Sequence, residues 1–446
     1  MRDELNNNMG LYSTSFLKMH VHTEEDLTDL KKVSELTEAT YLHEYIHFLQ
    51  DITTTYGFMN ISTVVDYIRL VNQTAVTKGQ KEFEVPFQPK SSDNNNVKAN
   101  WELKEIYLGG GRGINDVRII LKICKCIKIV ESNTGNKSVE YLVIEFEDSY
   151  KKLYKYTIGA YCISESMAYT IEQFIYPGVL PPANRMPYES VKIICDFLYP
   201  DFGNDPLNII ALCDACLMFF NPGPMLYDTL QEMIKQKFSP KIPEDIYEFV
   251  YENAKFNFNG HTTINQLLIS SGAEAIYQLS GYFTTEMFLE NRHWVNYIVS
   301  TGMNIRMEAP TFILDFVRNG KIKKNFLFAG LLHKLGSPFV VNDLFQLTFT
   351  PPTGTNFNIA PEYFWVINQN YKIFKGGKVT AGTYKCEMIK WCQDSCKNHK
   401  VDDRTDERCR NAPWERANDA DPNFCAFGKV WKTWGMKDEI PKSKIE

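Results

Sequence analysis

The sequence predicts an α+β protein with a mainly helical body and one small antiparallel sheet. Several long segments carry apolar residues at helical spacing, and one stretch, residues 119–158, alternates apolar and polar residues around a turn. The chain has 446 residues, of which 44% are hydrophobic and 13% aromatic, and this is ample for a packed core. We therefore expect a largely helical body that holds the sheet.

The first helical region is predicted over residues 24–76. Its central stretch, TEATYLHEYIHFLQ at residues 37–50, contains no Gly or Pro and has an apolar face beside its histidines. Thr23 and Asp26 form a start that resembles a capping box, and Gly57 is the predicted stop. A helix from this start to Tyr56 would be unusually long, so we expect a break within it.

The central stretch contains His43, Glu44 and His47 in the pattern H-E-x-x-H. Residues four apart lie one turn above each other on a helix, so both imidazoles leave the same face and can occupy two corners of a tetrahedral zinc site. Glu44, beside the first histidine, is then placed to take a proton from a water molecule on the metal. The alternative is a surface helix that happens to carry two histidines, but the apolar flank favours a buried helix.

Residues 77–100 are polar and are predicted to form a loop, and the glycines of GGGRG at 109–113 are predicted to form a turn. A phosphate-binding loop is disfavoured because no G-K-[ST] ending follows. The three strands expected in residues 119–158 form a β meander with a turn at 133–136. Its last strand, residues 153–158, is the candidate edge for pairing with an extended peptide.

The next helix is predicted over SESMAYTIEQ, residues 164–173. A catalytic zinc site takes three protein ligands and leaves one position open, so a third ligand is needed. Glu165 is the predicted third ligand and Glu172 the weaker candidate, since the two are seven residues apart and lie on nearly the same face. The alternative is that both are solvated helix carboxylates. Tyr169, one turn beyond Glu165, can face either the site or the core.

The H-E-Y-I-H sequence of residues 43–47, followed by E-S-M-A at 165–168, resembles the zincin metallopeptidases in their gluzincin arrangement. The resemblance implies a zincin-like body, zinc held by two histidines and one glutamate, and peptide hydrolysis with Glu44 as general base. Two features depart from it: Tyr169 stands where the thermolysin-like pattern has an Asp that orients a zinc histidine, and no third His follows soon after the second. The Glu-x-x-Ala motif is similar to that of intracellular regulatory zincins, including proteases linked to phage response in bacteria.

Three regions are predicted. Residues 1–180 form the catalytic core, residues 181–375 a mainly helical body that packs on it, and residues 376–446 a cysteine-rich segment. One interpretation of the last segment is a second, structural zinc, because a segment this polar has little core of its own. Free thiols and disulfides are the alternatives. The metal-ligand types in this segment are Cys386, Cys392, Cys396, His399, Cys409 and Cys425, and the structural zinc would take Cys392, Cys396, Cys409 and Cys425.

The sequence also bears on partners and location. Residues 1–16 show no secretory signal, and the longest apolar run, residues 209–220, is too short to span a bilayer. We therefore expect a cytoplasmic protein with a protein or peptide substrate and no membrane partner. A formal net charge of −6 argues against nucleic acid as a partner. The oligomeric state is left open.

The main functional prediction is a zinc-dependent metallopeptidase. Two alternatives share the metal: a zinc-binding regulatory or interaction protein without turnover, and a zinc amidohydrolase that acts on a small amide. The residue that would stabilise an oxyanion is not assigned, and the candidates are His261, His293, Arg185 and the tyrosines near Glu165.

Overall fold

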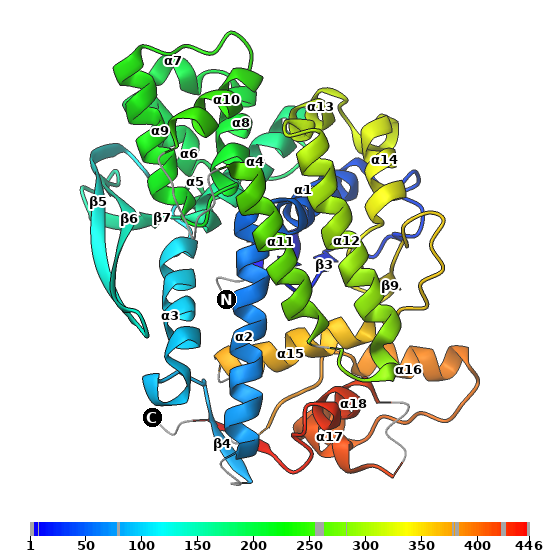
Figure 1. Ribbon diagram of the computed structural model, residues 1–446. Helices are drawn as coiled ribbons and strands as arrows, with labels where there is room; N and C mark the ends of the chain where they lie inside the picture. Colours follow the sequence, from blue (N-terminus) through cyan, green and yellow to red (C-terminus); the bar gives the residue numbers. More distant parts are fainter. Residues whose placement is uncertain are drawn as a thin grey trace.

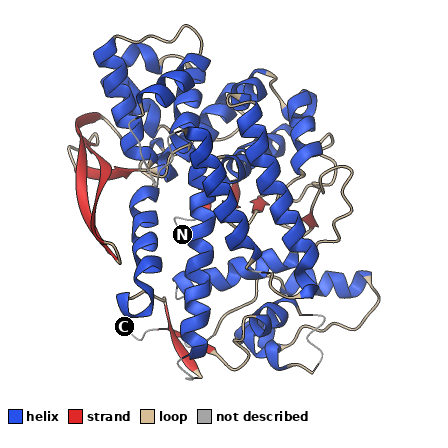
Figure 2. Cartoon of the chain, in the orientation of Figure 1, coloured by secondary structure: helices blue, strands red, loops and turns tan. Residues whose placement is uncertain are grey.

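The computed structural model describes residues 4–7, 9–77, 81–254, 263–281, 283–376, 379, 383–420 and 425–443. Over these residues the fold is α+β, as predicted: helices form most of the body, and three small sheets pack against them (Figure 1; Figure 2). One cluster of buried apolar residues runs along the chain from Tyr12 to Met436. In the described residues, no helix is long and apolar enough to cross a membrane.

Two consecutive helices, α1 (Glu35–Thr53) and α2 (Thr55–Thr77), take the place of the single region predicted over 24–76. The predicted start is wrong because the helix begins only after Ser34. The side-chain oxygen of Ser34 accepts a hydrogen bond from Thr37 N at 3.3 Å and so caps α1.

The expected break is present, but it lies at Thr54 and not at Gly57. Gly57 lies in the first turn of α2, where a Cβ atom would be 2.3 Å from the carbonyl oxygen of Asp51. The glycine therefore allows a close approach of α2 to the end of α1. It does not end a helix.

A five-stranded sheet that the sequence did not predict packs on α1. Its strand order is β1, β2, β3, β8, β9, and only the pair β3–β8 is parallel. These strands are two to four residues long and come from both ends of the chain, so no local alternation of apolar residues marks them. The strands are β1 (Glu4–Asn7), β2 (Gly10–Ser13), β3 (Lys18–Val21), β8 (Phe339–Val341) and β9 (Leu347–Thr348).

The predicted β meander is confirmed. It consists of β5 (Ile119–Ser132), β6 (Gly135–Glu147) and β7 (Leu153–Ile158), which are antiparallel to their neighbours. Strand β7 continues through Gly159 directly into α4 (Ala160–Ile175). The strand-then-helix unit expected around the third metal ligand is therefore present.

The prediction of a loop over residues 77–100 is wrong. The polar stretch begins α3 (Ser91–Leu108), and β4 (Glu82–Val85) precedes it. Packing favours the helix, because the ring of Trp101 stacks on that of Tyr67 in α2 with centroids 4.0 Å apart. A tertiary contact thus outweighs the low helix propensity of the asparagine-rich start.

The remaining elements form the rest of the helical body and the C-terminal region, in which α16, α17 and α18 lie together at the end of the molecule opposite α7 and α9 (Figure 1). They are α5 (Arg185–Tyr188), α6 (Ser190–Leu198), α7 (Pro200–Gly203), α8 (Pro206–Leu217), α9 (Pro222–Gln236), α10 (Glu244–Asn253), α11 (Ile264–Ser280), η1 (Glu286–Phe288), α12 (Leu289–Glu308), α13 (Phe312–Arg318), η2 (Ile322–Lys324), α14 (Phe326–Leu335), α15 (Glu362–Gly376), α16 (Ile389–Asn398), α17 (Glu407–Asn411), η3 (Pro413–Asn418), α18 (Ala426–Thr433) and β10 (Ile440–Ser443), which pairs in parallel with β4.

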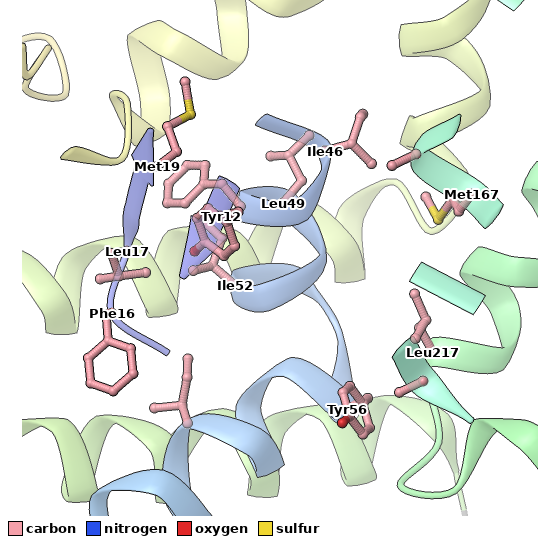
Figure 3. Packing of buried hydrophobic residues seen from close by; sticks show 14 of the residues in the cluster. Tyr12, Phe16, Leu17, Met19, Ile46, Leu49, Ile52, Tyr56, Met167 and Leu217 are labelled. Carbon is pink, nitrogen blue, oxygen red and sulfur yellow. The ribbon is translucent and has the colours of Figure 1, made fainter. Parts of the chain in front are cut away.

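Helix α1 is enclosed on nearly all sides. In Figure 3 the side chains of Tyr12 and Met19, from the five-stranded sheet, lie beside Leu49 and Ile52 of α1, while Met167 of α4 lies on another side of the helix. All five side chains are buried. A helix that carries histidines and carboxylates is therefore held in an apolar surrounding.

The C-terminal end of α1 is anchored by a buried ion pair between Arg306 of α12 and Asp214 of α8. The guanidinium nitrogens Nη1 and Nη2 of Arg306 donate to the two oxygens of Asp214 at 2.6 and 2.8 Å. Its Nε donates to the carbonyl of Thr53 at 3.1 Å, and Tyr247 of α10 donates to Asp214 at 2.7 Å. Arg306 thus satisfies a carbonyl group that α1 leaves without an intrahelical partner.

Replacing Arg306 by Met should lower the free energy of unfolding by about 3–5 kcal/mol, because Asp214 is then a buried charge without its partner. Arg318→Met is the matched control, since Arg318 pairs with Glu244 at the surface, where such pairs contribute about 0–1 kcal/mol. Denaturant unfolding followed by circular dichroism measures both. Adding Asp214→Asn to Arg306→Met should restore part of the loss, and equal effects of the two single variants would contradict the anchoring role.

Candidate metal centre

Helices α1 and α4 bring the three predicted metal ligands together. The Nε2 atoms of His43 and His47 lie 3.3 and 3.6 Å from Glu165 Oε2. One ligand atom from each of the three residues lies within 4.8 Å of the others, and all three side chains are buried. The two helices therefore place two imidazoles and one carboxylate around a single point.

Four polar atoms around this point have no hydrogen-bond partner among the described residues. They are both carboxylate oxygens of Glu44, Oε1 of Glu165 and Nε2 of His47. A buried carboxylate oxygen without a partner is costly, and a cation between these atoms removes that cost. Zinc takes imidazole nitrogen and carboxylate oxygen as ligands, so the residues present fit a zinc ion.

The pKa values of Glu165 and Glu44 are shifted in opposite directions. Burial acts to raise the pKa of Glu165, but the neighbouring imidazoles of His43 and His47 outweigh it and lower this pKa to about 2. Burial raises the pKa of Glu44 well above its usual range, and the charges of Glu165 and Glu172 add to the effect against that of His43. Glu165 is thus ionised, as a metal ligand must be, whereas Glu44 binds a proton readily, as a general base must.

Each histidine forms a hydrogen bond through its Nδ1 atom, the ring nitrogen that faces away from Glu165. His43 Nδ1 lies 2.9 Å from Glu172 Oε2, and His47 Nδ1 lies 2.8 Å from Gln50 Oε1. The amide of Gln50 in turn donates to the carbonyl of Ser164, on α4, at 3.2 Å. Partners of this kind hold the ring of a metal-ligating histidine in one orientation and raise its basicity.

Glu172 therefore takes a different role from the one considered in the sequence. Because its carboxylate bonds the outer nitrogen of His43, only Glu165 of the two candidates reaches the metal side. Among the described residues, the carboxylate that contacts His43 Nδ1, at 2.9 Å, is that of Glu172, three residues after Tyr169 on α4. Neither this role of Glu172 nor the contact of Gln50 was predicted. Gln50 lies three residues after His47, and this helical spacing is the signal that could have indicated the contact.

A cleft of about 160 Å³ leads to the centre. It reaches His43 and is bordered by α4 and by the segment 180–188. Tyr169 and Tyr188 form its aromatic side, with ring centroids 5.7 Å apart, and the ring of Tyr188 lies 6.3 Å from that of His43. The cleft thus approaches the metal ligands from the side of His43.

Glu44 does not border this cleft, because strand β2 covers it. The side chain is fully buried, and a Cβ atom on Gly10 would lie 2.5 Å from Glu44 Oε1. The strand beside the metal helix is therefore β2, and not the strand over 153–158 that the sequence indicated. In that strand, β7, the carbonyl of Thr157 already accepts a hydrogen bond from Gly110 N at 2.8 Å.

The position of the cleft shows which of the candidate residues lie close enough to the centre to stabilise an oxyanion. His293 is half exposed beside Glu290, and Arg185 is paired with Glu189 at 2.8 Å; neither borders the cleft. His261 lies outside the described residues. Of the residue types considered, the tyrosines of the cleft are the ones that lie near the centre.

Within the described residues, one other group of three ligand-type side chains is equally close. His20, His22 and Asp343 lie at the surface, where His20 Nε2 and His22 Nδ1 share Asp343 Oδ1 at 2.8 and 3.1 Å. The atoms that would face a metal ion here are already hydrogen-bonded to one another. The buried group has atoms without partners, and it is therefore the candidate centre.

Removing the carboxylate that orients His43 should weaken zinc binding without abolishing it. We expect Glu172→Ala to raise the zinc dissociation constant about 10–100-fold, with Glu172→Gln between it and the wild type, because an outer partner is lost while all three ligands remain. Glu165→Ala, which removes a ligand, should have the larger effect. Competition with a chromophoric chelator measures these constants, and Glu189→Gln at the surface is the matched control. Unchanged affinity in Glu172→Ala would contradict the orienting role.

Comparison of the chain with protein-family models, with curated proteins and with solved structures gives no match. The functional argument therefore rests on the geometry of this centre.

Proposed function

We propose that this protein is a zinc-dependent metallopeptidase that hydrolyses peptide bonds in a protein or extended peptide. One observation carries the proposal: His43, His47 and Glu165 meet in a buried group whose unpaired atoms call for a cation, with the free carboxylate of Glu44 beside it. A structural zinc site uses four protein ligands, whereas three ligands leave a position open for chemistry. The zincin-like character of the body belongs to this proposal.

A zinc ion bound by the three ligands would supply Lewis acidity, which polarises a carbonyl group and makes a water molecule easier to deprotonate. Glu44 accepts the proton of the attacking water and later gives it to the leaving nitrogen. The pKa of Glu44 is raised above its ordinary value because the side chain is buried, and a raised pKa makes this carboxylate a stronger base. Glu172 and Gln50 hold the two imidazoles in place during these steps.

Tyr188 is the residue that we assign to the developing oxyanion. Burial and the charge of Glu165 raise the pKa of Tyr188, so its hydroxyl group stays protonated and can donate a hydrogen bond. Its ring lies beside His43 at the inner end of the cleft. A donor placed where negative charge develops is worth several kcal/mol in the transition state, of the order of 3 kcal/mol for one hydrogen bond.

The position of β2 sets a condition on this mechanism. Because Gly10 lies directly against Glu44, water and a substrate carbonyl reach the carboxylate only when β2 moves away from α1. The same observation favours a second candidate function, a zinc-binding regulatory or interaction protein in which the strand stays in place and no turnover occurs. Measurement of activity together with zinc content separates the two.

The Glu44→Gln variant should retain zinc and lose about 10²–10⁴-fold in peptide hydrolysis, because the amide cannot accept the proton. Terminal labelling and mass spectrometry of a peptide library after incubation measure hydrolysis, and atomic emission measures zinc. Glu189→Gln is the matched control and should act as the wild type does. Equal hydrolysis by Glu44→Gln and wild type would exclude the mechanism, and bound zinc without hydrolysis in either would favour the second function.

Gly10→Ala tests the contact between β2 and the proposed base. Its methyl group would lie 2.5 Å from Glu44 Oε1 without displacement of one of the two. We expect peptide hydrolysis to fall at least tenfold while zinc content is unchanged, because the metal ligands are not touched. Gly330→Ala is the matched control, since a Cβ atom there meets nothing within 4 Å. Full activity of Gly10→Ala would show that the close contact does not constrain the base.

A further inference from the structure

The C-terminal region holds a group of thiols that the proposed centre does not use. Five cysteines lie between α15 and the end of α18, and none of them forms a disulfide. The region is built from short helices, and α16 has no buried residue. Its apolar packing is therefore thin for a segment of this length. The five are Cys386, Cys392, Cys396, Cys409 and Cys425.

Four of these thiols border one small cavity of about 30 Å³. Its other walls are mainly apolar and include Met388 and Phe427. A backbone hydrogen bond helps to hold two of these cysteines close together: the N–H of Cys386 donates to the carbonyl of Cys409 at 2.9 Å. The fifth cysteine, Cys396, borders only an adjoining hollow of about 390 Å³. The four thiols at the small cavity are Cys386, Cys392, Cys409 and Cys425.

The spacing of the thiols discriminates between metal centres. With Zn–S bonds of about 2.3 Å, a tetrahedral zinc ion holds its sulfur ligands about 4 Å apart. In the described part of the chain, no three thiol sulfur atoms lie within 4.8 Å of one another. A [4Fe–4S] cluster is a larger body than one metal ion, because each of its four thiolates binds a different iron atom, so the thiolates lie farther apart than those around a single zinc ion. The arrangement is wider than one zinc ion requires and suits a cluster.

We propose that the four cysteines at the small cavity ligate a [4Fe–4S] cluster. The set differs from the one considered for a structural zinc in the sequence, because Cys386 takes the place of Cys396. No redox step is assigned to the cluster. Its role is to hold together a region that has little core of its own, as structural metal centres do in small domains.

The surroundings of the cavity match what an anionic cluster needs. Arg416, whose side chain is only 5% exposed, borders the cavity and is held there by ion pairs with Asp406 at 2.7 Å and Asp419 at 3.0 Å. The backbone N–H of Gly428 donates to the sulfur of Cys425 at 3.4 Å. Buried positive charge and N–H donors to sulfur both stabilise the negative charge of a cluster with four thiolates.

The chain that enters this region is tightly attached to α15. Glu387, next to Cys386, accepts hydrogen bonds from Trp365 Nε1 at 3.0 Å and from Lys372 Nζ at 3.1 Å. Its own N–H donates to Gln369 at 2.8 Å. The first cluster ligand is therefore held in place by the body of the protein. The other three ligands come from α16, α17 and the residue that precedes α18, so a cluster would join all three helices to that anchor.

The test uses the full-length chain purified without oxygen. We expect about four iron and four acid-labile sulfide atoms per chain, broad absorbance near 400 nm, and an electron paramagnetic resonance signal after reduction with dithionite. Replacing any one of the four ligands by Ser should lower the iron content at least twofold. Cys396→Ser, at the adjoining hollow, and Cys216→Ser, in the core of α8, are the matched controls and should retain the cluster.

Several results would overturn the proposal. One is zinc in this region without sulfide; another is no iron or sulfide either in the purified protein or after anaerobic reconstitution with ferrous iron and sulfide. A third is unchanged iron in all four ligand variants. The far-ultraviolet circular dichroism spectrum and the denaturant unfolding transition report whether each variant is folded. The inference does not depend on peptide hydrolysis, and failure of one proposal leaves the other standing.

Discussion

The structure depends on a polar seam between two buried helices. Contacts of 2.8–3.6 Å run through Glu172, His43, Glu165, His47 and Gln50, from α4 to α1. The seam lies inside an apolar body, so its groups cannot turn to water for hydrogen bonds. The two helices must keep one relative position for these contacts to form, and the five-stranded sheet, α8 and α12 pack around them in that position.

The residues of the seam that could be predicted from the sequence are those whose positions follow from the spacing within one helix or from the order of neighbouring elements. His43 and His47 share a helix face because they are four residues apart, and Glu165 follows a strand that ends at the start of its helix. The partner of each outer ring nitrogen was not predictable in the same way. Glu172 was considered only as a ligand, and Gln50 was not considered. Only the packing of the two helices shows that these groups contact the Nδ1 atoms of His43 and His47.

The rest of the fold shows where local patterns are insufficient. Residues 91–100, which were expected to form part of a loop, are helical because the ring of Trp101 stacks on that of Tyr67. The two residues are too far apart in the sequence for a local pattern to indicate this contact. Strand β3 is defined by pairing with β8, through residues such as Lys18 and Phe339 that lie far apart in the sequence. Strands this short have little pattern of their own, whereas the long β meander alternates over enough residues to be recognised.

The seam also links stability to the metal. Glu44, Glu165 and Glu172 are buried together, and none of them forms an ion pair with a lysine or arginine among the described residues. In their place, His43 lies against Glu165 and Glu172, and His47 lies against Glu165. A zinc ion would compete with protons for the lone pairs of these groups. A cation that binds the folded chain and not the unfolded one stabilises the fold by mass action. The proposed chemistry depends on the unpartnered atoms of Glu44, Glu165 and His47. The same atoms make the packing of α1 on α4 depend on what is bound between the two helices.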